Sequence, residues 1–264
     1  MTRNNWVRSL GLDVDGTLFV DIDNGIRLYD SCLHRRLPHA VSIPPQDLMR
    51  TENRQLYYRF LTTLKEIENI FINSIYDDAS RQLEPGSVVV DAGARIGTFA
   101  ARISRTLGAE GKIIAIEPEP RNFACLRKNI EANGLKNIIA IQKALWSQEQ
   151  PLKIHLSGNS AAHSVHHDPF YSSTDSSVCV EADTLDRILE ELGIASVDFI
   201  KMDIEGSEIE ALKGMRKTLA SNVQLAIAAY HPVEGQLAHA VIVPQLAQLG
   251  FSTAYADGIV HARR

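Results

Sequence analysis

Short apolar runs alternate with helical segments along the chain from residue 87 onward. The runs, such as Val88 to Val90, are too short and too rich in β-branched residues for helices, which predicts buried strands. The strands predicted in this way cover residues 88–91, 112–117, 138–143, 152–156, 197–203 and 224–230. The segments between and after them predict helices over residues 98–107, 120–133, 184–192, 208–220 and 244–249. This alternation predicts an α/β fold with a doubly wound, mostly parallel sheet that binds its ligand at the carboxyl ends of the strands.

A stretch near the N-terminus predicts a β-hairpin. Asp15-Gly16 and Asn24-Gly25 are tight-turn signals, because Gly and Asn tolerate positive φ, and they predict paired strands at residues 17–22 and 26–29. The segment D-V-D-G-T-L, which begins at Asp13, also resembles the first motif of haloacid-dehalogenase-type phosphatases, where the first Asp is a phosphoryl-accepting nucleophile. That motif should end a buried apolar strand, and the sequence has no later G-D-x-x-x-D metal segment. A phosphatase that uses Asp13 and Asp15 is the alternative to a simple turn.

The segment that follows predicts an amphipathic helical region. Between residues 46 and 79, apolar side chains recur at three- and four-residue intervals, which fits one long helix or two helices with a break. Gly, Pro and Ser then mark the entry to the alternating region. We therefore expect an N-terminal extension at residues 1–82, built from the hairpin and the helices as a substrate-side cap, and a ligand-binding domain at residues 83–264.

The composition narrows the classes of function. The 264 residues carry a formal net charge of −5, which argues against a general nucleic-acid binder. The three cysteines, Cys32, Cys125 and Cys179, are widely spaced and suggest neither a disulfide framework nor a zinc motif. The first residues lack the apolar core of a signal peptide, and no apolar run approaches the length of a membrane span. We expect a cytoplasmic protein that acts on a small molecule. Its oligomeric state stays open, and a homo-oligomer is possible.

The first predicted strand of the domain leads into a cofactor-type turn. Asp91 ends the strand, Gly93 and Gly97 follow, and a predicted helix begins at Thr98. A dinucleotide fingerprint, G-x-G-x-x-G, would cradle a pyrophosphate, whereas the carboxylate in D-x-G-x-x-x-G would repel one. S-adenosylmethionine (SAM) carries an ammonium and a sulfonium and no phosphate, so the carboxylate favours it. Glu117 ends the second strand, where it can accept both ribose hydroxyls. The sequence therefore predicts SAM rather than NAD.

Several segments resemble one known family. V-V-V-D-A-G-A-R-I-G-T-F, I-I-A-I-E-P-E-P-R-N-F, N-I-E-A-N-G-L-K-N-I and F-I-K-M-D-I-E-G-S-E resemble FkbM-type SAM-dependent methyltransferases, and A-I-A-A-Y-H-P also fits. The resemblance covers about residues 85–255. It implies a class I methyltransferase fold, with a seven-stranded sheet whose last strand is antiparallel. It also implies methyl transfer to a hydroxyl of a small molecule of the sugar or polyketide type.

Carried over by position, the resemblance implies a set of cofactor contacts. The methionine part would lie at the glycine turn, the ribose at the end of the second strand and the adenine just past the third. The implied residues are Asp91, Ala92, Gly93, Ala94, Gly97, Thr98, Glu117, Pro118, Ala144, Leu145 and Asp203. One position departs from the family, which usually has Asn where this chain has Arg95. We expect that long cation to point to solvent or into the substrate pocket.

Three residues are candidates for catalysis. Asp203 ends an apolar strand, Glu205 follows two residues later on the same side, and His231 ends the next strand. Such groups suit a general base for an acceptor hydroxyl, or ligands for a divalent cation. In the alternative interpretation, Asp203 binds the cofactor ammonium, Glu205 or Ser207 caps a helix and His231 is structural. A SAM-binding module without catalysis also stays open.

Two further features carry weaker signals. Lys201 lies inside a strand, where we expect it either to extend its ammonium group toward solvent or to pair with an acid. A Ser- and His-rich loop at residues 157–177 contains H-x-x-H-H-D, formed by His163, His166, His167 and Asp168. Imidazoles at this spacing can bind a transition metal on a helical turn, but a long polar loop over a site is also typical of a substrate-side lid.

Overall fold

The computed structural model describes residues 6–32, 40–43, 54–77, 83–156, 163–165, 176–233 and 235–264. Its centre is a seven-stranded sheet with the order β15-β16-β12-β11-β5-β6-β7. The parallel strands are β5 (Val88–Ala92), β6 (Lys112–Ile116), β7 (Ile138–Ile141), β11 (Phe199–Met202) and β12 (Gln224–Ala228). The last strand, β16 (Ile259–Arg263), runs antiparallel to β12 and to β15 (Ser252–Ala256). The predicted doubly wound sheet with an antiparallel last strand is therefore confirmed.

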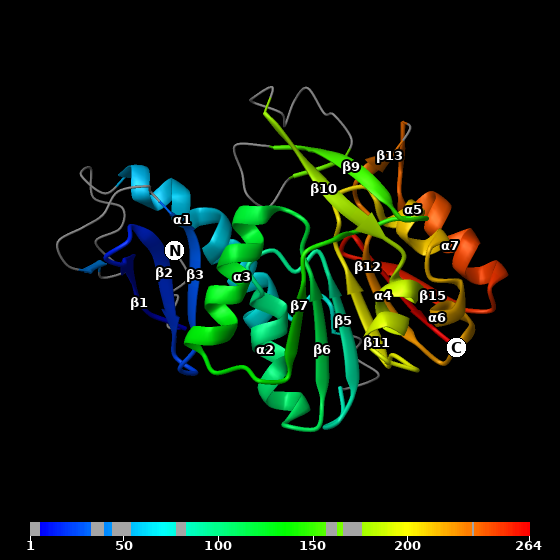
Figure 1. Ribbon diagram of the computed structural model, residues 1–264, viewed down its shortest axis with the longest axis horizontal. Helices are drawn as coiled ribbons and strands as arrows, with labels where there is room; N and C mark the ends of the chain where they lie inside the picture. The colour runs from blue at the N-terminus through cyan, green and yellow to red at the C-terminus, as the bar shows by residue number, and fades with distance from the viewer. Residues whose placement is uncertain are drawn as a thin grey trace.

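The inner parallel strands β5, β6, β11 and β12 are mostly apolar because both faces of the sheet are covered there. In β5, Val89 packs into the core of the first face, and Val90 and Ala92 pack into the core of the second. The helices of the first face are α2 (Thr98–Leu107) and α3 (Pro120–Ala132). Those of the second are α4 (Leu185–Glu191), α5 (Glu208–Lys213), α6 (Arg216–Ala220) and α7 (His239–Gln248), as Figure 1 shows. A strand buried on both faces reads as a continuous apolar run, which is why the sequence identified these strands.

Two helix predictions were wrong in detail. Residues 208–220 form α5 and α6 rather than one helix, and the break lies at Gly214. A Cβ added to Gly214 would lie 2.2 Å from the carbonyl oxygen of Trp146, so only glycine fits this contact. Helix α7 begins at His239, five residues before the predicted start, and keeps Pro244 inside it.

The extension forms a second, antiparallel sheet with the order β3-β2-β1-β4. Its strands are β1 (Val7–Leu12), β2 (Thr17–Ile22), β3 (Arg27–Cys32) and β4 (Val41–Ile43), followed by helix α1 (Arg54–Ile67) and a π-helical turn, η3 (Glu68–Ile72). The predicted hairpin is confirmed as β2 and β3, but the sequence did not predict β1 or β4.

The D-V-D-G-T-L segment is a hairpin turn between β1 and β2. The Gly16 amide donates to the carbonyl of Asp13 at 2.8 Å, and the Asp13 amide donates to the carbonyl of Thr17 at 2.9 Å. Lys128 Nζ lies 2.9 Å from Asp15 Oδ2 and 3.6 Å from Asp13 Oδ2, so a protein cation balances both acids. The simple turn is therefore favoured over the phosphatase motif.

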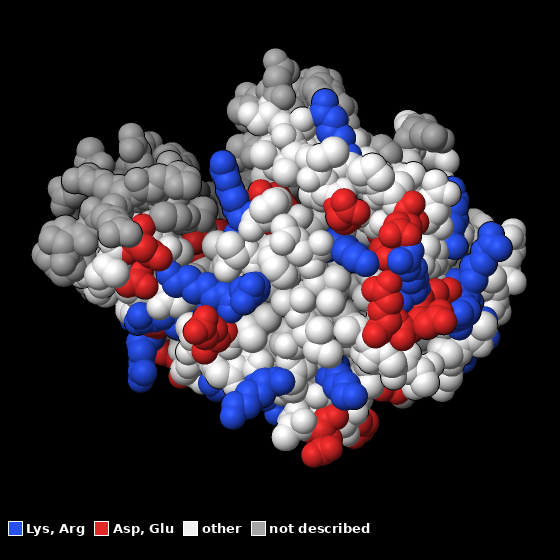
Figure 2. Space-filling view, viewed as in Figure 1, with Lys and Arg blue, Asp and Glu red and all other residues white. Residues whose placement is uncertain are grey.

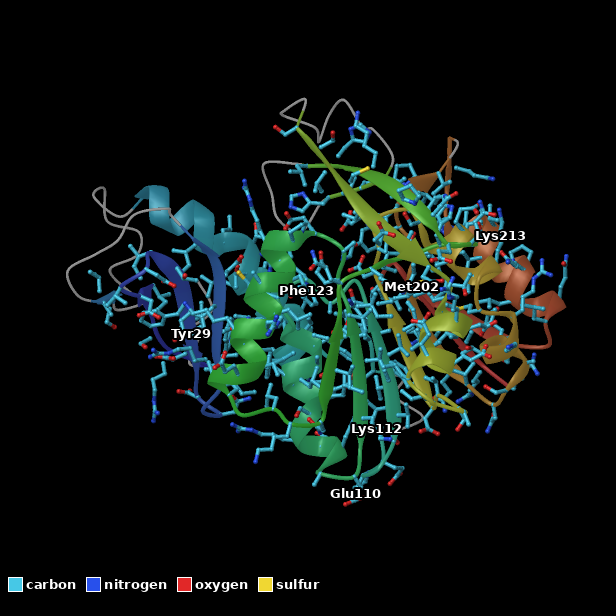
Figure 3. The ribbon with its side chains drawn as sticks, in the orientation of Figure 1. Tyr29, Glu110, Lys112, Phe123, Met202 and Lys213 are labelled. Carbon is cyan, nitrogen blue, oxygen red and sulfur yellow. The ribbon has the colours of Figure 1, made fainter. Side chains whose placement is uncertain are left out.

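A third sheet lies near the carboxyl edge of the main one. It has the order β8-β10-β9, with β8 (Ala144–Leu145), β9 (Gln150–His155) and β10 (Ser177–Asp183), and the sequence did not predict β10. A small ribbon is formed by β13 (Pro232–Val233) and β14 (Gln236–Leu237). In Figure 3, Lys112 at the start of β6 marks the amino ends of the parallel strands, and Met202 at the end of β11 marks their carboxyl ends. Met202 lies on the side of β9 and β10.

The surface, the helices and the cysteines add one observation each. Figure 2 shows acidic and basic side chains of the described residues interspersed on the face that it draws, without a broad basic patch there. Within the described ranges, every helix is too short or too polar to cross a membrane. Cys125 and Cys179 are free thiols.

Helix α3 completes the free edge of the N-terminal sheet. Asn129 accepts from the Tyr29 amide at 2.6 Å and donates to the Tyr29 carbonyl at 2.9 Å, and Asn133 makes the same pair of bonds with Arg27. The two asparagines are one helical turn apart, and they face alternate residues of β3. Asn129 also donates to the carbonyl of Ile96 at 2.7 Å, so one buried amide joins the extension to the glycine turn.

We expect Asn129→Ala to lower the free energy of unfolding by about 3 kcal/mol, because it leaves buried backbone groups of two segments without partners. Urea unfolding followed by circular dichroism measures this loss. Asn73→Ala is the control, since the Asn73 amide makes an exposed bond, and it should stay within about 0.5 kcal/mol of the wild type. An Asn129→Ala protein as stable as that control would contradict the predicted role.

Candidate active site

A cavity of about 970 Å³ opens at the carboxyl edge of the parallel strands. Its wall includes the turn after β5, the ends of β6 and β11, residues from β8 and β9, and the segment from Leu61 to Tyr76 of the extension. The carboxyl edge is where α/β sheets bind their ligands, so the observed position matches the prediction. Its volume lies at the upper end of the range for ligand pockets, which leaves room for a nucleoside-sized cofactor and an acceptor.

The turn after β5 packs directly on the end of β11. Gly93 adopts φ +73°, and a Cβ there would lie 1.8 Å from the carbonyl oxygen of Asp203. The Gly93 and Ala94 amides both donate to the carbonyl of Ile116 at the end of β6. Gly93 of the turn after β5 thus contacts the ends of both neighbouring strands, β6 and β11, and has no room for a side chain.

Asp91 lies beneath the cavity rather than in its wall. Its carboxylate is fully buried, and Oδ1 lies 3.1 Å from Nζ of Lys201, which also donates to the carbonyl of Gly93 at 2.8 Å. Burial disfavours the charged form of Lys201, but Asp91 and then Asp203 outweigh it and raise the pKa of Lys201. The prediction that Lys201 pairs with an acid is confirmed, and the charge of Asp91 is balanced within the protein.

Glu117 follows β6 and lines the cavity. Its carboxylate accepts from the amides of Arg95 at 2.9 Å and Glu119 at 3.0 Å. Burial raises the pKa of Glu117 to about 7, although both hydrogen bonds favour the ionised form. The carboxylate is thus held rigidly at the strand end where the sequence placed a ribose acceptor.

Asp203, Glu205 and His231, the three candidates for catalysis, lie close together. His231 Nε2 lies 3.2 Å from Glu205 Oε2 and 4.0 Å from Asp203 Oδ1, and all three residues line the cavity. His231 Nδ1 lies 3.5 Å from Oε1 of the fully buried Glu208. Tyr76 of the extension donates to Asp203 Oδ2 at 2.7 Å. The sequence predicted neither contact, because Tyr76 lies outside the motifs and Glu208, the last residue of D-I-E-G-S-E, reaches His231 only in the folded chain.

The surroundings of His231 favour its protonated form. Burial lowers the pKa of His231, but Glu205 and Glu208 outweigh burial and raise this pKa to about 10. The sequence-based expectation was a histidine that titrates near neutral pH. The flanking carboxylates change that expectation, because the imidazole holds its proton between them.

The other predicted cofactor residues separate into two groups. Gly93, Glu117, Pro118, Ala144, Leu145 and Asp203 line the cavity. Ala92, Ala94 and Thr98 are buried behind it, and Gly97 adopts φ +86° at the start of α2, with the side chain of Leu126 against it. These residues shape the turn rather than the surface of the cavity.

The His-rich loop reaches the cavity at its described residues, 163–165. His163 lines the wall, and burial lowers its pKa, while Ser164 donates to the carbonyl of Glu205 at 2.6 Å. Glu205 adopts φ +54°, an uncommon conformation for a non-glycine residue, so this contact holds a strained segment. His166, His167 and Asp168 lie outside the described residues, and the metal site suggested for them stays a prediction.

Arg95 lies at the cavity wall, where acids of the extension hold its side chain. Its guanidinium donates to Asp30 of β3 at 2.7 Å and to Glu66 of α1, and the residue is buried at the edge of the cavity. Of the two predicted environments, solvent is wrong because the residue is buried, whereas Arg95 and Glu66 do line the cavity. The unusual Arg in the glycine turn was the only local signal for this contact.

Comparison with known proteins agrees with this fold. The domain described as "Methyltransferase FkbM domain" is recognised over residues 91–253, which is more than half of the chain. The chain belongs to the FkbM methyltransferase family. The resemblance seen in the sequence segments is therefore confirmed.

Several known proteins are similar to part of this chain. Hexuronic acid methyltransferase AglP of Haloferax volcanii is 30% identical over 143 residues, which cover 53% of this chain and 54% of AglP. 31-O-demethyl-FK506 methyltransferase FkbM of Streptomyces tacrolimicus is 25% identical over 199 residues, which cover 65% of this chain and 76% of the relative. The crystal structure of methyltransferase FkbM from Methylobacillus flagellatus KT shares the fold, with a TM-score of 0.50 and 21% identity over 71% of this chain and 46% of that one. The chain thus spans about half the length of two of these three proteins.

We expect Gly93→Ala to lower the free energy of unfolding by at least about 3 kcal/mol, because the new Cβ would collide with the Asp203 carbonyl. Gly86→Ala is the matched control. Gly86 has a similar φ of +87° but nothing within 4 Å of the added Cβ, so it should lose only about 1 kcal/mol from backbone strain. Urea denaturation of both variants compares the two losses, and equal losses would mean that the contact with β11 is unimportant.

Proposed function

We propose that the chain binds SAM at the turn after β5 and transfers its methyl group to a hydroxyl oxygen of a small molecule. The observation that carries this proposal is the arrangement of one glycine turn and two strand-end carboxylates, Glu117 and Asp203, around a single cavity. Membership of the FkbM methyltransferase family supports it.

The residues present fit the cofactor. Gly93 lets the turn pack against the end of β11 at the cavity wall, and Glu117 offers a carboxylate to the two ribose hydroxyls. Asp203 Oδ1 is buried without a hydrogen-bond partner among the described residues, and it is an acceptor available to the ammonium of the methionine part. Pro118, Ala144 and Leu145 supply an apolar wall for the adenine. When bound, SAM supplies the activated methyl group, and the protein aligns the acceptor with it.

The acceptor is proposed to be a sugar or a polyketide-type molecule. The support is the names of the two relatives, one a hexuronic acid methyltransferase and the other a methyltransferase of an O-demethylated FK506. In this chain, the wall formed by residues 61–76 adds apolar and polar side chains, such as Leu61, Asn69 and Tyr76, to the part of the cavity outside the glycine turn.

The group at Asp203, Glu205 and His231 is proposed to receive the hydroxyl proton. His231 and Glu205 lie 3.2 Å apart, and all three side chains line the cavity, where an acceptor hydroxyl can come within reach of a base. Glu208 and Tyr76 hold the histidine and Asp203 from behind. We assign the function to the group, because its members share the proton.

The same three side chains offer ligand atoms within 4.8 Å of one another, which suits a divalent cation. Their outer partners also fit, because metal-binding histidines and carboxylates are usually held by further polar groups: Tyr76 donates a hydrogen bond to Asp203, and Glu208 Oε1 lies 3.5 Å from His231 Nδ1. A cation there would take the place of the imidazole proton and lower the pKa of an acceptor hydroxyl.

We expect the wild type to bind the demethylated cofactor, S-adenosylhomocysteine, in calorimetry, and Glu117→Gln to weaken this binding on the order of tenfold to a hundredfold. Glu131→Gln, an exposed change on α3, should leave it unchanged. A wild type without affinity would refute the cofactor assignment. Binding without methyl transfer to any hydroxylated acceptor would favour the non-catalytic module.

The affinity should also depend on pH through Glu117. Because its pKa is raised to about 7, the carboxyl group is protonated below that pH and cannot accept both ribose hydroxyls. Binding must then release a proton, so we expect the affinity to fall by up to about tenfold per pH unit below 7 and to level off above it. Calorimetric titration with S-adenosylhomocysteine over roughly three pH units, from about 5.5 to about 8.5, measures this dependence. Glu117→Gln should lose this dependence, and a persistent slope in that variant would assign the titration to another group.

Metal binding at the proposed base is tested with EDTA-treated protein titrated with Mn²⁺ in a calorimeter. We expect one binding site that His231→Gln removes, while affinity for S-adenosylhomocysteine changes by less than about threefold. Both His231→Gln and Glu205→Gln should lose tritium transfer from methyl-labelled SAM to hydroxylated sugars such as glucuronic acid. If the wild type does not bind Mn²⁺, the site holds a protonated His231 and no metal ion. Full activity in both variants would rule out a base at this position.

A further inference from the structure

Arg95 occupies a position where its backbone and its side chain act on different parts of the protein. The residue lies between Gly93 and Gly97 with φ +50°, in the left-handed region. Its amide donates to Glu117 Oε2 at 2.9 Å, so the proposed ribose carboxylate is oriented by this one backbone group on its turn side. A change in the Arg95 backbone would therefore move a donor away from Glu117.

The side chain of Arg95 extends in the other direction, to the extension. Its guanidinium donates to Asp30 Oδ2 at 2.7 Å and to Glu66 Oε2, and the side chains of Arg95 and Asp30 are only 9% and 5% exposed. Asp30 lies on β3 and also accepts a hydrogen bond from Thr63 of α1. The guanidinium thus joins the sheet and the helix of the extension at one buried point.

The conformation of Arg95 needs such support. Arginine rarely adopts positive φ, whereas asparagine tolerates it much better. Burying a guanidinium is also unfavourable unless acids pair with it. Asp30 and Glu66 supply that pairing here, so the acids of the extension hold both the charge and the turn conformation of Arg95.

We propose that Arg95 is a positioning residue through which the N-terminal extension orients Glu117 for the cofactor ribose. The inference rests on the proposed function, and it adds a specific claim: the extension is part of the cofactor site although Asp30 does not line the cavity. By reciprocity, a ligand that binds at Glu117 stabilises the docked extension.

Asp30→Asn is the decisive variant, because it keeps the shape of the side chain and removes the charge that faces Arg95. We expect it to weaken S-adenosylhomocysteine binding on the order of tenfold in calorimetry. Asp21→Asn is the matched control, since Asp21 lies in the same sheet and also pairs with an arginine, Arg27, but away from the cavity. That control should bind within about twofold of the wild type.

Arg95→Met tests the same link from the other end, because methionine keeps a long unbranched side chain and the strained positive φ while the ion pairs are lost. It should weaken binding as Asp30→Asn does, and the double variant should bind no more weakly than Arg95→Met alone. Arg95→Lys should restore part of the affinity. Independent losses that multiply in the double variant would overturn the proposal.

Hydrogen exchange of the wild type gives a readout that needs no variant. Adding S-adenosylhomocysteine should slow exchange in β3 and in residues 61–77 as well as at the glycine turn. A wild type that binds this ligand with unchanged exchange in the extension, or an Asp30→Asn protein that binds like the wild type, would overturn this inference alone. A wild type that does not bind the ligand would overturn the proposed function and this inference together.

Discussion

Ionised groups withdrawn from water must be paired, and this constraint organises the floor of the cavity. Asp91 is paired with Lys201, Arg95 with Asp30 and Glu66, and His231 with carboxylates on both of its nitrogens. Each pair joins segments that are distant in the sequence. The pairs therefore fix the relative positions of the strands, the glycine turn and the extension as well as the electrostatics of the site.

The pairing also refines the charge argument made from the sequence. Three acids at neighbouring strand ends favoured a cationic cofactor over a phosphate-bearing one. In the structure, Lys201 balances Asp91, so the carboxylates that remain for a ligand at the cavity wall are Glu117 and Asp203. The preference for a cationic ligand therefore rests on two carboxylates rather than three. The Arg95 amide holds Glu117, and the Tyr76 hydroxyl holds Asp203.

The sequence predicted the features that depend on local patterns. The apolar run before Asp91, the glycine turn and the acids at strand ends each have a signal within a few residues. The strands β1, β4 and β10 lacked that signal, because polar residues interrupt them or because they are short. Contacts such as Tyr76 with Asp203, 127 residues apart, and Arg95 with Asp30, 65 residues apart, depend on the folded topology, so a single sequence does not identify the partners.

The asparagines of α3 have a consequence for synthesis of the chain. A ribosome makes the sheet of residues 7–43 first, yet the partners for the edge groups of Arg27 and Tyr29 arrive only about 100 residues later, at Asn129 and Asn133. Until then the nascent sheet presents an open edge that could pair with another chain. Completion of α3 closes that edge, so the helix acts as a built-in protection against misassembly once it has emerged.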